Sequence, residues 1–219
     1  MPSKMNSPSD YATRSRSDRN PVLLIHGITD TTIVFRTMSA YLSGLGWKVY
    51  SFNLIPNNGD LGLDELARQV ADFVAKTFDP QQPLDVIGFS MGGIVSRYYI
   101  QRLGGIDRVQ RFISISAPNQ GTLAAYLSRR PGCVQMRPDS ALLWDLNRDA
   151  AMLGRLNFTV IWTPYDLIIV PPRSSQMPVG KEVIVPARLH SWMLADKGCI
   201  KAVAAALSEP ILAARSSVP

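Results

Sequence analysis

Short apolar runs alternate with longer amphipathic segments along most of this chain. Residues 21–27, PVLLIHG, form an apolar run that ends at a glycine, which is typical of a strand buried on both faces of a parallel sheet. Similar runs at residues 83–89 and 157–163 predict further strands of this kind. From Leu63 onward, apolar side chains recur at three- and four-residue steps, which predicts an amphipathic helix.

The other predicted elements continue the alternation. Further strands are expected at residues 48–54, 111–117 and 182–185, and further helices at residues 31–45, 91–103 and 191–207. Strands that alternate with helices imply right-handed crossovers and a mostly parallel sheet with helices on both faces. The pattern therefore predicts an α/β fold of three layers, built on a sheet of about six strands.

We expect most of the chain to form one domain. The 219 residues fit a typical domain length of about 100 to 200 residues, and no repeat or low-complexity linker divides them. Residues 1–20 are rich in Ser, Arg and Asp, which predicts a flexible N-terminal arm, so the domain spans residues 21–219.

A long insertion interrupts the alternation at residues 121–156, where a strand is expected. Loops of this length inside compact domains are often functional lids, so we expect a cap or lid here. Apolar side chains gather at residues 142–146. They fit an apolar lid as well as a helix packed on the core.

The charge and the apolar runs narrow the choice of partners and compartment. The net charge is +6, and Arg14, Arg16 and Arg19 lie in the arm. This excess fits solubility or contact with an anionic membrane surface, but not nucleic acid, because the other basic residues are scattered. No run reaches the about 18 apolar residues of a membrane-spanning helix, and the first twenty residues carry no visible secretory signal. We expect a cytoplasmic protein, with peripheral membrane contact as an option.

The two cysteines have no chemical pattern of their own. Cys133 and Cys199 lack metal-binding or redox spacing, and they leave open either one disulfide or two free thiols. Accordingly, the sequence predicts neither a metal ion nor an organic cofactor.

Residues 88–92, GFSMG, match the G-x-S-x-G pattern of a nucleophile elbow. A predicted strand precedes them and a predicted helix follows, which the motif requires because its serine sits on a strained turn between the two. Gly88 and Gly92 remove side chains that would collide there. Ser90 is therefore the candidate nucleophile, and the Met91 amide, at the start of the helix, is a candidate oxyanion donor.

A serine hydroxyl needs a base within hydrogen-bond reach, and this base is most often histidine. In a fold whose triad runs serine, acid, histidine along the chain, His190 is the expected base, because of the two histidines only it follows Ser90. His26 ends the first predicted strand beside Gly27. We expect it to be buried, hydrogen-bonded and involved in shaping the oxyanion loop.

The acid of the triad should lie between Ser90 and His190, at the end of a strand. Asp166 comes just after a predicted strand and is the expected acid, with a simple turn-forming role as the alternative. The other aspartates at suitable chain positions look like solvated helix, cap or lid residues: Asp107, Asp139, Asp145 and Asp149.

Together these motifs resemble the small bacterial lipases of the α/β-hydrolase superfamily, the group that includes the lidless lipase A type of bacilli. The similarity runs from about residue 21 to residue 207, with the following landmarks: VLLIHGI at 22–28, GFSMGG at 88–93, ISAPNQGT at 115–122, Asp166 with IVP at 169–171, and LHS at 189–191. Matching positions imply oxyanion donors at the backbone amides of Ile28 and Met91. The insertion is longer than a lidless lipase needs, and MRPDS at 136–140 is similar to a segment before a cap helix in larger lipases.

The expected activity is serine ester hydrolysis through an acyl-enzyme intermediate, as in a lipase that acts on acyl esters of lipids. Apolar residues dominate the segment expected beside the site, which favours medium or long acyl chains. A short-chain carboxylesterase, a thioesterase and an acyltransferase fit the same residues. An inactive ligand-binding module of the same fold is the alternative outside the enzymes, and the oligomeric state stays open.

Overall fold

The computed structural model describes residues 19–212 of the chain. Its strands form one six-stranded sheet in the order β2-β1-β3-β4-β5-β6, and every neighbouring pair is parallel. The predicted α/β fold with a parallel sheet is confirmed. The strands are β1 Val22–Ile25, β2 Val49–Ser51, β3 Leu84–Phe89, β4 Val109–Ile115, β5 Asn157–Trp162 and β6 Lys181–Ile184.

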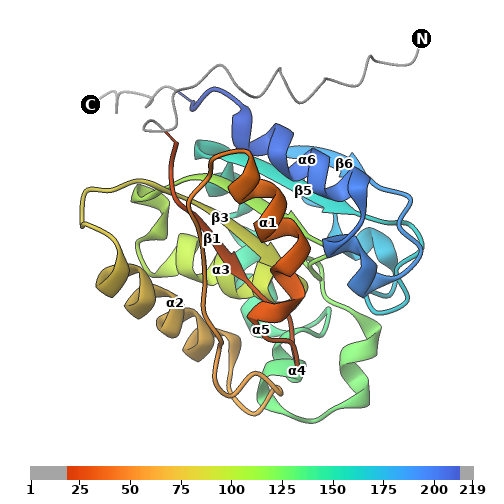
Figure 1. Ribbon diagram of the computed structural model, residues 1–219. Coiled ribbons are helices and arrows are strands. Elements are labelled where there is room, and N and C mark those ends of the chain that lie inside the picture. Colours follow the sequence, from red (N-terminus) through yellow and green to blue (C-terminus); the bar gives the residue numbers. More distant parts are fainter. Residues whose placement is uncertain (1–18, 213–219) are drawn as a thin grey trace.

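Helices cover both faces of this sheet, with α2 and α3 on one face and α1 and α6 on the other (Figure 1). The α-helices are α1 Arg36–Gly44, α2 Leu63–Thr77, α3 Met91–Arg102, α4 Pro131–Gln135, α5 Ala141–Arg148 and α6 Lys197–Ser208. Short 3-10 helices lie between them: η3 Thr32–Phe35, η4 Gly105–Asp107, η5 Leu123–Leu127, η6 Ala150–Arg155, η7 Pro172–Ser175 and η8 His190–Leu194.

Each face of the sheet has its own apolar core, which explains the continuous apolar runs in the sequence. In β1, Val22 and Leu24 belong to the core under α1 and α6, whereas Leu23 and Ile25 belong to the core under α2 and α3. Successive side chains of a strand point to opposite faces, so a strand covered on both sides is apolar at nearly every position.

The structure shortens one predicted strand and divides two predicted helices, of which the one over residues 31–45 becomes η3 and α1. The strand predicted over residues 48–54 is only the three residues of β2, which pairs with β1 alone at the edge of the sheet. The helix predicted over residues 191–207 is divided between η8 and α6. The division occurs because Asp196 caps a new helix, its carboxylate accepting a hydrogen bond from the Cys199 N–H at 2.9 Å.

Of the predicted arm at residues 1–20, only Arg19 and Asn20 are described. The Arg19 guanidinium stacks 4.1 Å from the centre of the Trp47 ring, and Asn20 is buried. The rest of the arm, including Arg14 and Arg16, lies outside the described residues.

Cys133 and Cys199 are unpaired and buried in different cores, so two free thiols is the correct alternative of the two that the sequence left open. Among residues 19–212, no helix has both the length and the apolar character needed to cross a membrane.

A buried ion pair lies near the amino ends of β3 and β4. Arg111 contacts Asp85 at 3.1 Å, with 3% and 0% of the two side chains exposed, and Asn20 also donates a hydrogen bond to Asp85 at 2.9 Å. Burial raises the pKa of Asp85 to about 6, although Arg111 and Asn20 oppose the shift. Because the folded-state pKa is raised, ionised Asp85 favours unfolding above pH 6, and this penalty disappears as the pH falls.

Replacing Arg111 with methionine should lower the free energy of unfolding by about 3 to 5 kcal/mol at pH 8, because it leaves a buried carboxylate without its partner. The loss should be smaller at pH 5, where Asp85 is protonated. Urea unfolding at both pH values measures it. Arg155→Met is the matched control, since its pair with Asp107 is exposed, and it should cost less than about 1 kcal/mol. Equal losses in the two variants would contradict this account of the pair.

Candidate active site

Ser90 lies in a tight turn between β3 and α3, with a backbone φ of 54° and ψ of −126°. A positive φ is uncommon for a residue with a side chain, and such strained positions cluster at functional sites. Close packing explains the two flanking glycines. A Cβ on Gly92 would lie 2.2 Å from the carbonyl oxygen of Ile25, and one on Gly88 would lie 2.6 Å from the carbonyl oxygen of Gly92. Side chains at these positions would push β1, β3 and α3 apart.

His26 follows β1 and is fully buried. Its Nε2 accepts a hydrogen bond from the Leu54 N–H at 3.0 Å. The ring proton is therefore on Nδ1, which donates to the carbonyl oxygen of Gly27 at 2.9 Å. Both ring nitrogens are engaged within the protein, so His26 is placed to hold this loop rather than to remove a proton from Ser90.

The hydrogen bonds that the Gly27 carbonyl accepts set the direction of the Ile28 amide. The peptide bond between Gly27 and Ile28 is trans and planar, so its C=O and N–H point in opposite directions. Because His26 and the Asp30 N–H both donate to this carbonyl, the Ile28 N–H faces the other way. Within residues 19–212, neither this amide nor that of Met91 donates a hydrogen bond, so both are available to an oxyanion.

Asp166 and His190 meet in the segments that follow β5 and β6. The Nδ1 of His190 donates to Asp166 Oδ2 at 2.7 Å, with 12% and 2% of the two side chains exposed. This bond fixes the proton on Nδ1 and leaves Nε2 able to accept one. The imidazole ring packs on Phe89, the neighbour of Ser90, with 4.9 Å between ring centres. The three predicted residues thus lie just after the carboxyl ends of β3, β5 and β6, and the Ser90 hydroxyl makes no hydrogen bond to another described residue.

The surroundings of Asp166 keep it ionised. Burial acts against the charge, but the hydrogen bond from His190 and those from the Ile168 and Ile169 amides outweigh it, so the pKa of Asp166 lies below its ordinary value. Both amides donate to the same oxygen, Oδ1, at 2.9 Å. The other oxygen is left to His190.

The remaining aspartates that suited the acid by chain position are engaged elsewhere. The partners are Arg155 for Asp107, the Tyr126 hydroxyl for Asp139, and Arg102 for both Asp145 and Asp149. Among the aspartates that the structure describes, only Asp166 is hydrogen-bonded to the imidazole of His190.

Residues 21–146 match the family model described as palmitoyl protein thioesterase. The chain belongs to this family. The match spans the loop after β1, the turn at Ser90 and the start of the insertion, up to Leu146 in α5.

Solved structures agree with this assignment at the level of the fold. A lipase from Bacillus licheniformis in its mature form has a TM-score of 0.66 at 12% identity, over 84% of this chain and 87% of that chain. A bromoperoxidase from Bacillus anthracis has a TM-score of 0.65 at 16% identity, over 87% and 92%. A pyrethroid hydrolase from Sphingobium faniae JZ-2 has a TM-score of 0.58 at 15% identity, over 88% and 98%.

The predicted membership of the α/β-hydrolase superfamily is therefore confirmed. The family is one of thioesterases, which indicates a hydrolase that acts on esters.

In this member of the palmitoyl protein thioesterase family, Thr122 supports the loop that carries Asp166. Its hydroxyl donates to the carbonyl oxygen of Ile168 at 2.8 Å and accepts from the Val170 N–H at 2.9 Å. The sequence included Thr122 only as a landmark of the resemblance. Its role became visible only once the fold had brought β4 and β5 side by side.

Sequence reasoning missed a second carboxylate in this thioesterase-family site. Asp30 and Ser90 both lie close to Gly27. A Cβ built on Gly27 would be 2.8 Å from Asp30 Oδ2 and 3.1 Å from Ser90 Cβ. Burial raises the pKa of Asp30, although His26, His190 and the Gly27 amide oppose the shift. The sequence feature that could have identified Asp30 is its position in the loop after β1, three residues after Gly27.

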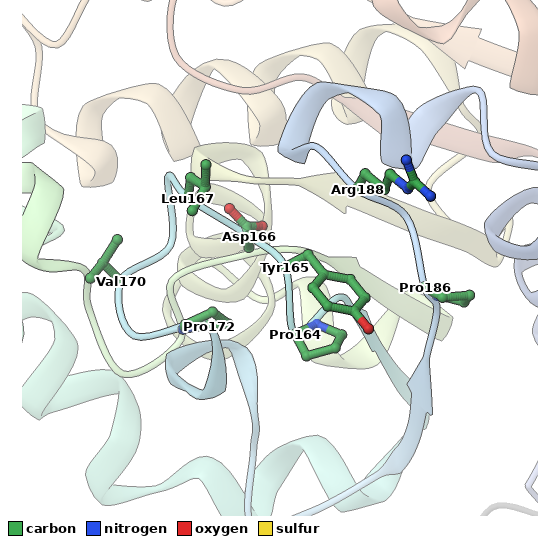
Figure 2. A pocket seen from close by; sticks show the side chains of 8 residues that line it. All are labelled: Pro164, Tyr165, Asp166, Leu167, Val170, Pro172, Pro186 and Arg188. Atoms are coloured by element: carbon green, nitrogen blue, oxygen red, sulfur yellow. The ribbon is translucent and has the colours of Figure 1, made fainter.

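A cavity of about 840 Å³ lies beside Asp166, between the segment after β5 and the segment before His190 (Figure 2). Its size is within the range of small-molecule sites, which are mostly apolar with a few polar groups. The walls fit this description: Pro164, Tyr165, Asp166, Leu167, Val170, Pro172, Pro186 and Arg188.

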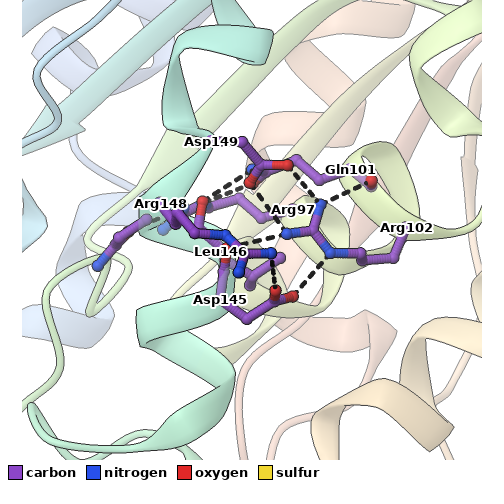
Figure 3. A network of polar contacts seen from close by, with 8 residues as sticks. Arg97, Gln101, Arg102, Asp145, Leu146, Arg148 and Asp149 are labelled. Carbon is purple, nitrogen blue, oxygen red and sulfur yellow. Dashed lines mark hydrogen bonds and ion pairs between the residues drawn. The ribbon is translucent and has the colours of Figure 1, made fainter.

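The insertion at residues 121–156 is attached firmly to the rest of the domain. Leu143 and Leu146 of α5 are buried in the core beside α3. Arg102 of α3 binds Asp145 at 2.7 Å and Asp149 at 2.9 Å (Figure 3). Within the apolar cluster, Leu143 and Leu146 pack on the core, whereas Trp144 is 66% exposed, and a lid role for the insertion stays a prediction.

A buried cation strengthens this attachment. Arg97 of α3 has no exposed surface, and its guanidinium donates to the side chains of Gln101 and Asn147 and to the carbonyl oxygen of Asn119. Burial lowers its pKa to about 9. Gln101 in turn donates to the carbonyl oxygen of Leu146 at 2.8 Å. Hydrogen bonds and ion pairs therefore join α3, which follows Ser90, to α5 of the insertion.

Replacing Arg102 with glutamine should loosen α5. We expect amide hydrogen exchange in residues 143–148 to become about tenfold faster or more, because hydrogen bonds to charged groups contribute about 1.5 to 3 kcal/mol each. Arg148→Gln is the control, since the pair with Asp145 and the contact with the Trp144 ring that it removes both lie within α5. Fast exchange of α5 in the wild-type protein would show instead that the insertion moves.

Proposed function

We propose that the protein is a serine hydrolase that cleaves acyl esters of lipids through an acyl-enzyme intermediate. Ser90 is the nucleophile, His190 the base and Asp166 the acid that orients the base. The observation that carries this proposal is the hydrogen bond between His190 and an ionised Asp166, at the sheet edge where Ser90 occupies a strained turn.

In the first half of the reaction, Ser90 Oγ attacks the ester carbonyl carbon while His190 Nε2 takes the hydroxyl proton. The negative charge that develops on the carbonyl oxygen is received by the amides of Ile28 and Met91, the second of which begins α3. Collapse of the intermediate breaks the bond to the alcohol, and His190 returns its proton to that leaving group.

In the second half, water attacks the acyl-enzyme and gives its proton to His190. The acid leaves, and the proton returns to Ser90. Asp166 stays ionised throughout and stabilises the imidazolium in both halves.

Apolar surroundings support a medium or long acyl chain. The cavity beside Asp166 is walled mainly by apolar side chains. Large side chains on the neighbouring segments are exposed, among them Leu123, Leu167 and Leu189. An acyl chain lying along them would remove apolar surface from water, which is worth about 0.8 kcal/mol per buried CH₂.

A second candidate is hydrolysis of long-chain acyl thioesters, and the match to the palmitoyl protein thioesterase model favours it. The same residues would act, with a thiol in place of the alcohol. A thiolate is a better leaving group than an alkoxide, since a cysteine thiol has a pKa of about 8.5. Protonation by His190 is then less demanding.

A matched series of substrates tests both candidates. Butyrate, octanoate and palmitate are compared as oxyesters and as thioesters of the same small leaving group, with and without an emulsified interface. We expect kcat/KM to rise from butyrate to octanoate or palmitate. A consistent preference of at least about tenfold for thioesters at equal chain length would favour the second candidate. The best rates on butyrate would indicate a short-chain carboxylesterase and contradict the lipid substrate.

A further inference from the structure

Large apolar side chains protrude around the candidate active site. They lie on η5, on the segment after β5 and on both sides of His190, and we refer to them as the apolar rim: Leu123, Leu127, Leu167, Ile168, Leu189 and Trp192. Leu127 is 91% exposed, Leu167 75% and Trp192 57%. Contiguous exposed apolar side chains of this size mark interaction surfaces, whereas isolated ones do not.

Contacts between the segments make the rim one surface. The Leu123 N–H donates to the carbonyl oxygen of Val170 at 2.8 Å, so η5 lies against the segment that carries Leu167 and Ile168. Leu167 and Arg188 line the same cavity, and Leu189 follows Arg188 (Figure 2). Figure 1 has the segments that follow β4, β5 and β6 on one side of the molecule.

Two exposed cations lie within this surface. Arg129, two residues after Leu127, and Arg188 are exposed, and neither has an ion pair within residues 19–212. Of the carboxylates near the site, Asp166 binds His190, Asp139 accepts a hydrogen bond from the Tyr126 hydroxyl, and Asp30 is partly buried beside Gly27. The rim therefore combines protruding apolar groups with cations that lack a partner.

We propose that the apolar rim docks the protein on the surface of an anionic phospholipid bilayer. This inference rests on the proposed function, because docking there brings membrane-held acyl groups to Ser90. Single side chains that protrude into solvent suit insertion among lipid headgroups and acyl chains. The two arginines would lie at the level of the lipid phosphates. A second copy of the chain is a poorer occupant, because a symmetric contact would bring the same cations together.

Vesicle co-sedimentation tests the docking directly. We expect the protein to bind phosphatidylcholine vesicles with 30% phosphatidylglycerol about tenfold or more tightly than pure phosphatidylcholine vesicles, and less tightly at high salt. Leu127→Ser should weaken binding at least about tenfold through lost apolar burial. Arg188→Gln should weaken it about fivefold. Circular dichroism and thermal unfolding establish that the variants are folded.

Two matched controls lie at the other ends of the strands, near where β5 and β2 begin. Leu212 is 49% exposed and its N–H binds Asn157 at the start of β5, and Lys48 precedes β2. Leu212→Ser and Lys48→Gln should bind vesicles like the wild type. Equal loss in rim and control variants, absence of binding to anionic vesicles, or a dimer that dissociates in Leu127→Ser would each overturn the proposal.

Hydrolysis of a water-soluble ester separates the two proposals. A wild-type protein that hydrolyses the soluble ester but leaves anionic vesicles unbound contradicts the docking alone. A protein that binds vesicles but hydrolyses no ester contradicts the proposed function. Ser90→Ala should bind vesicles as tightly as the wild type.

Discussion

Replacing Ser90 with alanine should lower kcat for ester hydrolysis by as much as about 10⁶-fold, because no other group in the site can form the acyl-enzyme. The fold should survive, since the hydroxyl of Ser90 makes no hydrogen bond among the described residues. A small residual rate above water is expected from the amides of Ile28 and Met91, which the substitution leaves in place. Steady-state hydrolysis of a p-nitrophenyl ester measures the loss.

Ser43→Ala is the control for this experiment, because Ser43 is an exposed serine on α1, remote from Ser90 in the sequence. Its rate should equal that of the wild type. A Ser90→Ala protein that keeps more than a tenth of the wild-type rate would show that another residue is the nucleophile.

Replacing Asp166 with asparagine should lower kcat by about 10⁴-fold, although the shape of the side chain is unchanged. The reason lies in the two amides of Ile168 and Ile169, which both donate to Asp166 Oδ1. An asparagine would place its only carbonyl oxygen there and turn its NH₂ group toward His190. The Nδ1 of His190 would then accept a hydrogen bond, and the ring proton would move to Nε2. The imidazole could no longer take a proton from Ser90.

Asp139→Asn is the matched control, since Asp139 is exposed and binds only the Tyr126 hydroxyl. The rates of both variants on the same ester decide the matter. A loss that is larger in Asp139→Asn than in Asp166→Asn would transfer the role of the acid to the insertion and contradict the proposed triad.

The fold could be predicted from the sequence because its signals are local. Continuous apolar runs such as residues 22–25 need burial on both faces, which a parallel sheet between two helical layers provides. The turn at Ser90 was also a local signal, since the two glycines mark where β3, α3 and β1 approach closely. Chain order then left His190 as the base.

The parts that could not be predicted depend on contacts between distant segments. Thr122 meets Ile168 across 46 positions of the chain, and Arg97 meets Asn147 across 50. No periodicity shows that these residues will be neighbours. The insertion was therefore open to two interpretations, because its apolar face alone does not tell whether it packs on the core or on a ligand. The start of α6, by contrast, could have been predicted, because an aspartate such as Asp196 commonly caps the first turn of a helix.

Ser90 is the proposed nucleophile, activated by His190 and Asp166. Mass spectrometry of the intact protein after reaction with a fluorophosphonate probe, followed by peptide mapping, tests it most directly. We expect one probe per molecule, attached to Ser90, and none in protein unfolded by denaturant. Attachment to a different residue, or no attachment to folded protein at all, would contradict it.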